Sequence, residues 1–251
     1  MKRSLIKFLL FVLIAAIALP LIAAPAAPLN LDVTKVVNSV NFSNTINLML
    51  ALAMISLIPF FLISMTSFIR VVIVLGMIRT AVGTQQVPPT PVIISLGLFM
   101  TMFIMAPVWN EIQLTALTPY NQGKISQAVM WQKAELPIKQ FMLNQTREKE
   151  LAMFVEFSQL GEVSDSKDIP LYVIIPAFAI SELKTAFQMG FLIYIPFMVI
   201  DMIVANILLS LGMFMLSPVM ISLPFKLLLF VLADGWYLIT RGLLTSFGTL
   251  S

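Results

Sequence analysis

The stretch LYVIIPAFAISELKTAFQMGFLIYIPFMVI, residues 171–200, decides the fold class. It is apolar over more than the roughly 20 residues that an α-helix needs to cross a bilayer. Only Glu182 and Lys184 interrupt it. A charged side chain at the bilayer centre costs at least about 2.5 kcal/mol. The stretch therefore predicts a membrane helix whose two charges need partners.

The composition of the whole chain also indicates a membrane protein. Of its 251 residues, 59% are hydrophobic and only 11% are charged, which a soluble domain of this size cannot bury around one core. Its net charge of +3 comes from Lys2, Arg3 and Lys7, so no nucleic-acid-binding face is expected. The predicted fold class is an all-α membrane protein made of helical hairpins with kinked helices.

The N-terminus has the pattern of a signal peptide. The three basic residues precede an apolar run at 8–19, and the small-residue stretch AAPAA at 23–27 offers a cleavage site. Residues 1–26 are therefore predicted to be a signal peptide. An uncleaved membrane anchor is the alternative, although the apolar run is short for a span.

Residues 46–110 are predicted to form a first hydrophobic helical hairpin. Its first arm is Ile46–Ile69, and a kink is expected at Pro59 because proline removes a backbone donor and clashes with the preceding turn. Arg70 and Arg79 follow this arm. They favour a cytoplasmic loop, since basic residues accumulate in cytoplasmic loops.

Residues 111–168 are predicted to be a soluble extracytoplasmic helical segment, because they hold 14 of the 27 charged residues of the chain. Helices are expected around 124–144 and 146–159. Thr146 stands where it can cap the second of these helices, and Glu148 lies in its first turn, near the positive end of the helix dipole.

Residues 169–251 are predicted to form a second hydrophobic hairpin with a Met-rich loop. Its arms are expected at 171–200 and 221–244, and a third short span over 202–216 is an alternative. Five charged residues interrupt this segment: Glu182, Lys184, Asp201, Lys226 and Asp234.

These five charges cannot neutralise one another within a helix. Glu182 and Lys184 are two residues apart and face different sides, while Lys226 and Asp234 are about two turns apart. Each charge needs a partner on another helix, on another subunit or in water. This favours a role in assembly or transport over snorkelling at a helix end.

The sequence contains no pattern that indicates catalysis. It has no cysteine and no histidine, which excludes thiol nucleophiles, disulfides and structural zinc sites of the usual kind. The signatures of metalloproteases, serine hydrolases and P-loop nucleotide-binding proteins are also absent. We therefore predict no catalytic residue, no cofactor and no metal site.

Long motifs in this chain resemble the FliP family, flagellar biosynthetic proteins at the core of the type III export gate. In the last third the motifs are PAFAISELKTAFQ (176–188), YIPF (194–197), LPFKL (223–227) and DGW (234–236). In the first hairpin they are TSFIRVVIVL (66–75) and QVPP (86–89). The resemblance covers nearly everything after the predicted signal peptide.

This resemblance implies a subunit of a larger assembly. Members of the family associate in several copies with FliQ and FliR, and with FlhB and FlhA, into a helical hetero-oligomeric gate. Unfolded flagellar export substrates pass through this gate across the bacterial inner membrane, at the flagellar basal body. A separate ATPase and the proton motive force supply the energy. A multi-pass inner-membrane protein without enzymatic activity is therefore expected.

The resemblance also implies a role for the loop at 212–218. Met213, Phe214 and Met215 lie where relatives carry a run of methionines that forms a gasket around the pore, and Phe214 departs from that run. Unbranched, polarizable methionine can seal a narrow pore and repack around a passing polypeptide. Spacing alone favours plain packing, in a chain with 17 methionines; the gasket follows from the resemblance.

Two other functions remain as alternatives. The nearer one is the injectisome counterpart of the family, although the signal peptide and the 111–168 segment favour the flagellar branch. The more distant one is an independent small-solute channel or carrier. Such proteins are typically built from inverted repeats, and this sequence shows no internal repeat.

Overall fold

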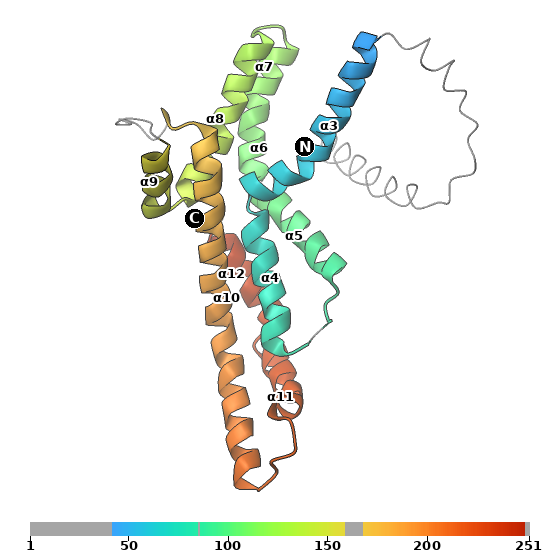
Figure 1. The fold of residues 1–251 in the computed structure, drawn as a ribbon, viewed down its shortest axis with the longest axis vertical. Helices are drawn as coiled ribbons and strands as arrows, with labels where there is room; N and C mark the ends of the chain where they lie inside the picture. Colours follow the sequence, from blue (N-terminus) through green and yellow to red (C-terminus); the bar gives the residue numbers. More distant parts are fainter. Residues whose placement is uncertain (1–41, 85, 159–167, 249–251) are drawn as a thin grey trace, which may run out of the picture. The chain divides into compact units, whose positions relative to one another are not determined.

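The computed structural model describes residues 42–84, 86–158 and 168–248, and all regular structure in these ranges is helical (Figure 1). The predicted all-α membrane fold is confirmed. The signal peptide predicted for residues 1–26 lies outside the described residues. The chain divides into two compact units, Met1–Ser56 and Leu57–Ser251, and the contacts described below belong to the second.

The helices carry the labels of Figure 1. In chain order they are α3 (Phe42–Met65), α4 (Phe68–Val82), α5 (Thr90–Ile104), α6 (Ala106–Ile112), the π-helix η1 (Gln113–Leu117), α7 (Thr118–Asn121), α8 (Gln127–Gln145), α9 (Glu148–Phe157), α10 (Leu171–Ser210), α11 (Pro218–Leu232) and α12 (Gly235–Thr245). Pro59 lies inside α3, which continues to Met65.

Helix α10 organises the second unit. It is one continuous helix of 40 residues that includes Pro176 and Pro196, and it contacts α4, α8, α9 and α11 (Figure 1). Gly190 of α10 leaves room for Met77 of α4, because an added methyl group would overlap that side chain. The separate short span considered for 202–216 is absent, since α10 continues to Ser210.

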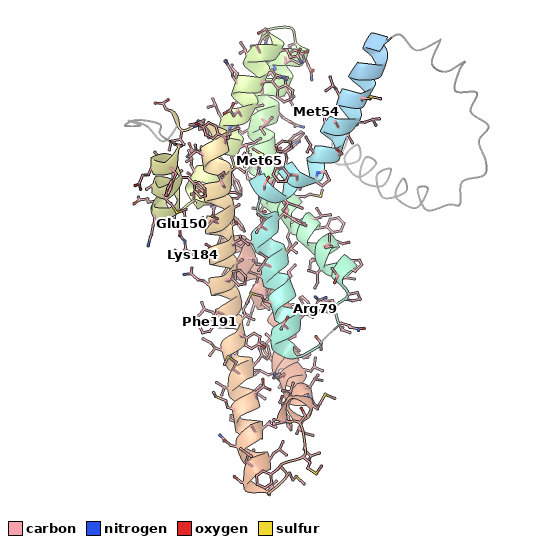
Figure 2. All side chains as sticks on the ribbon, viewed as in Figure 1. Met54, Met65, Arg79, Glu150, Lys184 and Phe191 are labelled. Atoms are coloured by element: carbon pink, nitrogen blue, oxygen red, sulfur yellow. The ribbon has the colours of Figure 1, made fainter. Side chains whose placement is uncertain are left out.

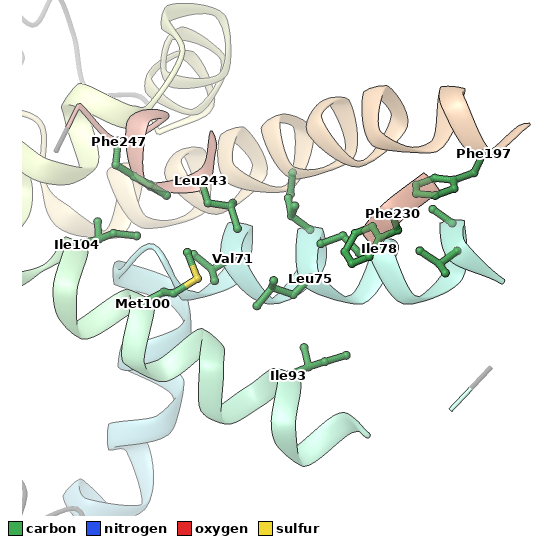
Figure 3. Packing of buried hydrophobic residues seen from close by; sticks show 14 residues of the cluster. Val71, Leu75, Ile78, Ile93, Met100, Ile104, Phe197, Phe230, Leu243 and Phe247 are labelled. Carbon is green, nitrogen blue, oxygen red and sulfur yellow. The ribbon is translucent and has the colours of Figure 1, made fainter. Parts of the chain in front are cut away.

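The main hydrophobic core surrounds α4. Val71, Val74, Leu75 and Ile78 recur every three or four residues, so they form one apolar stripe, and each is at most 2% exposed. Figure 3 shows this stripe among side chains from α5, α10, α11 and the region of α12. In a bilayer such side chains stabilise the fold through close packing, because transfer from lipid to a protein interior has no hydrophobic driving force.

Two smaller cores lie under the charged middle of the chain. Met142 of α8 packs with Val173 and Phe178 of α10, and residues of α9 cover this group. Ala116 of η1 packs with Met130 of α8. The helices at 127–145 and 148–157 are thus fixed to α10 and to η1 by buried apolar contacts.

Thr146 does not cap α9 as the sequence predicted. It follows α8, and its hydroxyl donates to the Met142 carbonyl at 2.7 Å. Arg147 occupies the N-cap position of α9, and its backbone N–H donates to Ser181 Oγ of α10 at 3.1 Å. The start of α9 therefore has no side-chain cap, and the backbone N–H of its N-cap residue is bonded to α10 instead.

One described helix, α10, is long and apolar enough to cross a membrane by itself. Three pairs of consecutive helices meet the same length and composition criteria when joined. The pairs are α3 with α4, α5 with the helical run 106–121, and α11 with α12. The second pair bends by 51° and the third by 62°. Broken helices of this kind agree with the predicted kinks.

Candidate functional site: buried ion pairs and the methionine loop

Arg70 of α4 lies inside the protein and uses all five of its N–H donors. Its Nε donates to Glu182 Oε2 at 2.9 Å, and one terminal nitrogen forms the ion pair with Glu182 Oε1. The same nitrogen donates to Gln145 Oε1 at 3.0 Å. The other donates to the Ser246 carbonyl at 3.2 Å and to its hydroxyl at 3.1 Å. The Phe247 ring centroid lies 3.8 Å from Arg70 Cζ, in a cation–π contact.

Arg70, one of the two arginines that favour a cytoplasmic loop in the sequence, lies near the start of α4, away from the α4–α5 loop. Its side chain is 3% exposed, and Glu182 is fully buried. A buried charge persists when it is paired and its donors are satisfied, as they are here. Arg79 does lie at the loop, where it donates to the Thr90 hydroxyl at 3.1 Å (Figure 2). The cytoplasmic position of this loop stays a prediction.

A second pair, Lys184 and Glu150, joins α10 to α9 (Figure 2). Lys184 Nζ donates to Glu150 Oε1 at 2.7 Å. This hydrogen bond lowers the pKa of the Glu150 carboxyl below its ordinary value, against the opposing effect of burial. The Lys184 side chain is 44% exposed, so solvent screens the pair more than it screens Arg70 and Glu182.

A third pair, Asp201 and Lys226, joins α10 to α11. Lys226 Nζ donates to Asp201 Oδ2 at 2.6 Å, and the Ser222 hydroxyl donates to Asp201 Oδ1 at 2.5 Å. Lys226 and Ser222 are buried, whereas the Asp201 side chain is 30% exposed. Four of the five charges that could not pair within a helix therefore meet partners on other helices of the same chain.

Asp234, the fifth charge, is different. It lies exposed at the break between α11 and α12, with a left-handed backbone (φ 50°). It occupies the N-cap position of α12 without a side-chain capping bond. Within the described part of the chain, its carboxylate has no ion pair.

The methionine loop, residues 211–217, starts from a tight helix end. The Met213 N–H donates to the Leu208 carbonyl at 2.9 Å, and the Gly212 N–H donates to the Leu209 carbonyl at 3.1 Å. These two bonds form a Schellman motif, whose left-handed residue is Gly212 (φ 72°). The motif turns the chain out of α10 immediately before Met213.

The side chains of the methionine loop are uncovered. Met213, Phe214 and Met215 are 48%, 77% and 99% exposed. The adjoining faces of α10 and α11 also expose apolar side chains, and an open apolar groove lies between these helices. The groove is lined by Ile200, Ile203, Val204, Ile207, Leu208, Ile221 and Phe225. An apolar surface of this extent indicates contact with lipid or with other proteins.

Comparison with known proteins identifies the family. A model of the FliP family matches residues 51–243. The chain belongs to the FliP family. The Flagellar biosynthetic protein FliP of Bacillus subtilis (strain 168) is 56% identical over 207 residues, which cover 82% of this chain and 94% of the relative. That of Aquifex aeolicus (strain VF5) is 46% identical over 209 residues, covering 82% and 87%.

A third FliP relative, from Pectobacterium carotovorum subsp. carotovorum, is 45% identical over 203 residues, covering 81% of this chain and 79% of the relative. The resemblance seen in the sequence motifs is thus confirmed. The part that matches the FliP family model includes the three ion pairs and the methionine loop, while Ser246 and Phe247 lie beyond it.

Sequence reasoning missed the acceptors of Arg70, because Glu182, Gln145 and Ser246 are 112, 75 and 176 residues away along the chain. One local signal was available. Apolar residues flank Arg70 on both sides within one helical stretch, which favours an interior position over a loop. Among the described residues, no cluster of three or more acidic side chains could hold a metal ion.

Proposed function

We propose that several copies of this chain, with FliQ and FliR and in contact with FlhB and FlhA, form the pore of the flagellar type III export gate. As a member of the FliP family, the chain is a component of flagellar biosynthesis and export. The match to this family over residues 51–243 carries the proposal. The relatives carry the flagellar name, which favours this branch over the injectisome.

The uncovered surface of the α10–α11 hairpin supports an assembly of several subunits. Its charged residues pair within the chain, whereas its apolar side chains around the groove do not. Contact with neighbouring subunits would bury this surface with no unpaired charge left at the contact. The apolar surface of the α10–α11 hairpin would then be buried only in the assembly.

The methionine loop is the proposed gasket of this pore. Met213, Phe214 and Met215 follow the hydrogen-bonded end of α10; Phe214 and Met215 are mostly exposed and Met213 is about half exposed. Flexible methionine side chains from several copies would close a narrow opening against water and ions. Phe214 adds a stiffer ring to the same seal.

The proposed placement puts two hydrophobic hairpins, 46–110 and 169–251, in the bacterial inner membrane and the 111–168 segment outside the cytoplasm. Residues 1–26 would direct this orientation as a signal peptide. The chain would conduct unfolded flagellar proteins at the basal body without a catalytic step, a cofactor or a metal of its own.

Replacement of Met213, Phe214 and Met215 by alanine tests the gasket. We expect cells with this variant to leak small ions or dyes, because alanine cannot fill the opening, while the complex still co-purifies in mild detergent. A matched control replaces Val129, Trp131 and Leu136 of α8, which are also exposed, and should not leak. Unchanged permeability in a fully assembled loop variant would overturn the proposal.

A further inference from the structure

Lys226 connects three helices. It belongs to α11, and its Nζ donates to Asp201 of α10. The end of α4 lies on another side: a methyl group placed on Gly83 would be 3.9 Å from Lys226 Nζ and 3.9 Å from Leu223 Cδ1. Because the Lys226 side chain is only 3% exposed, its ammonium group is surrounded by these elements and scarcely by water.

The end of α4 is electrostatically suited to this lysine. Gly83 is the C-cap of α4, and its N–H donates to the Thr80 carbonyl at 3.1 Å. The last carbonyl groups of a helix carry partial negative charge, which attracts a nearby cation. Lys226 is thus attracted by the Asp201 carboxylate and by the C-terminal end of α4.

Helix α4 thus has a buried charged side chain of the α10–α11 hairpin near each of its ends. At its N-terminal end, Arg70 pairs with Glu182 of α10, and at its C-terminal end Gly83 approaches Lys226. The α10–α11 hairpin continues from Asp201 and Lys226 to the methionine loop. The α4–α5 loop starts at Gly83. Both loops therefore follow helices that lie near the ammonium group of Lys226.

We propose that Lys226 is a positioning residue that couples the α4–α5 loop to the methionine loop. A protein that binds the α4–α5 loop would displace the end of α4. Through Lys226, this displacement would change the position of the α10–α11 hairpin. A role of this coupling in opening or closing the gate rests on the proposed function. The coupling itself is a property of the chain.

Distance measurements between two spin labels test the coupling. The sequence has no cysteine, so the labels on Val87→Cys and Met215→Cys, at exposed positions of the two loops, are the only ones on this chain. Pulsed electron paramagnetic resonance on the assembled complex, with labelled copies diluted among unlabelled ones, gives the distribution of the distance between them.

Gly83→Ala should broaden this distribution, because an L-residue is strained at φ 88° and displaces the helix end. Lys226→Met should broaden it at least as much. The two substitutions together should broaden it no further than Lys226→Met alone, because both act on one contact. Unchanged widths, or widths that add in the double variant, would refute the coupling.

Gly123→Ala is the matched control. Gly123 also has a positive φ (67°), and an added methyl group there would meet nothing within 4 Å. The same backbone strain is therefore introduced in a distant loop, between α7 and α8, and the distance distribution should not change. Broadening in this variant would show a general loosening of the fold and would count against the proposal.

Ion leakage separates this inference from the proposed function. If Gly83→Ala and Lys226→Met broaden the distribution while the alanine variant of the methionine loop does not leak, the coupling stands and the gate assignment fails. If the loop variant leaks while the distribution stays narrow in both single variants, the gate assignment stands and the coupling fails.

Discussion

The two halves of α10 have opposite surroundings. The first half buries Ile174, Phe178, Glu182 and Ala186 completely, against α4, α8 and α9. The second half leaves Phe191, Leu192, Met202, Ile203 and Ile207 more than half exposed. One continuous helix thus packs the interior face of its first half against its own chain, with Tyr172 and Phe187 left exposed, while its second half exposes more of its apolar side chains.

The difference shows that the position of a charged residue does not by itself indicate which apolar surface of the chain is left exposed. Glu182 in the first half and Asp201 in the second are both paired within the chain. The halves differ in how their apolar side chains are covered. Charge pairs therefore define how this chain folds, while the exposed apolar faces define where it needs neighbours.

Of the substitutions that test this difference between the two halves of α10, Arg70→Met should have the largest effect on the stability of the chain. It leaves Glu182 buried without its partner, and breaking a buried ion pair in this way costs about 3–5 kcal/mol. The double variant Arg70→Met/Glu182→Met should be more stable than Arg70→Met, because no unpaired charge remains. Unfolding of the purified protein in detergent, followed by circular dichroism, measures both. Equal stability of Arg70→Met and the unmodified protein would contradict the prediction.

A matched pair of isoleucines compares the two halves directly. Ile174→Ala, at a fully buried position, should destabilise the chain by about 2–5 kcal/mol through the cavity it leaves. Ile203→Ala, at a position 54% exposed in the groove, should change chain stability by no more than about 0.5 kcal/mol.

The same two variants should differ in assembly. Ile203→Ala should weaken co-purification of further subunits in mild detergent, since it removes part of the uncovered surface. Equal destabilisation by Ile174→Ala and Ile203→Ala would show that the two halves of α10 do not differ in how their apolar side chains are covered.

The smallest effect is expected at the pair of Lys184 and Glu150, whose lysine side chain is 44% exposed. Because the pKa of Glu150 is lowered in the folded protein, its contribution to stability is present above the ordinary value of 4.5. This contribution is lost as pH falls through the lowered pKa. Glu150→Gln should therefore remove a small acid-dependent part of the stability. A pH titration of unfolding that is identical in the two proteins would argue against this role.

The sequence was sufficient to predict helices, membrane character and the need for interhelical partners, because these depend on composition and on residue spacing. It was insufficient for Arg70, whose acceptors come from three distant segments. It also failed at Thr146, because Arg147 holds the N-cap position of α9 and its backbone N–H is bonded to Ser181 of α10. Propensity rules describe local structure, whereas both errors arose from contacts across the fold.

Pro196 is a third position at which a local sequence rule does not predict the structure. Proline removes a backbone donor and commonly kinks or ends a helix. In the structure α10 continues past Pro196 to Ser210. Phe197 next to it packs against Phe230 of α11, with ring centroids 6.5 Å apart.

The hydrogen bonds of Arg70 also constrain the order of events during synthesis. Two of its five donors are satisfied by Ser246, which is translated 176 residues later. Until then, the guanidinium group is incompletely paired even if Glu182 has already reached it. The interior of this unit is therefore completed only after residue 246 has left the ribosome, and a stalled or shortened nascent chain would keep a partly unpaired charge that quality-control proteases can detect.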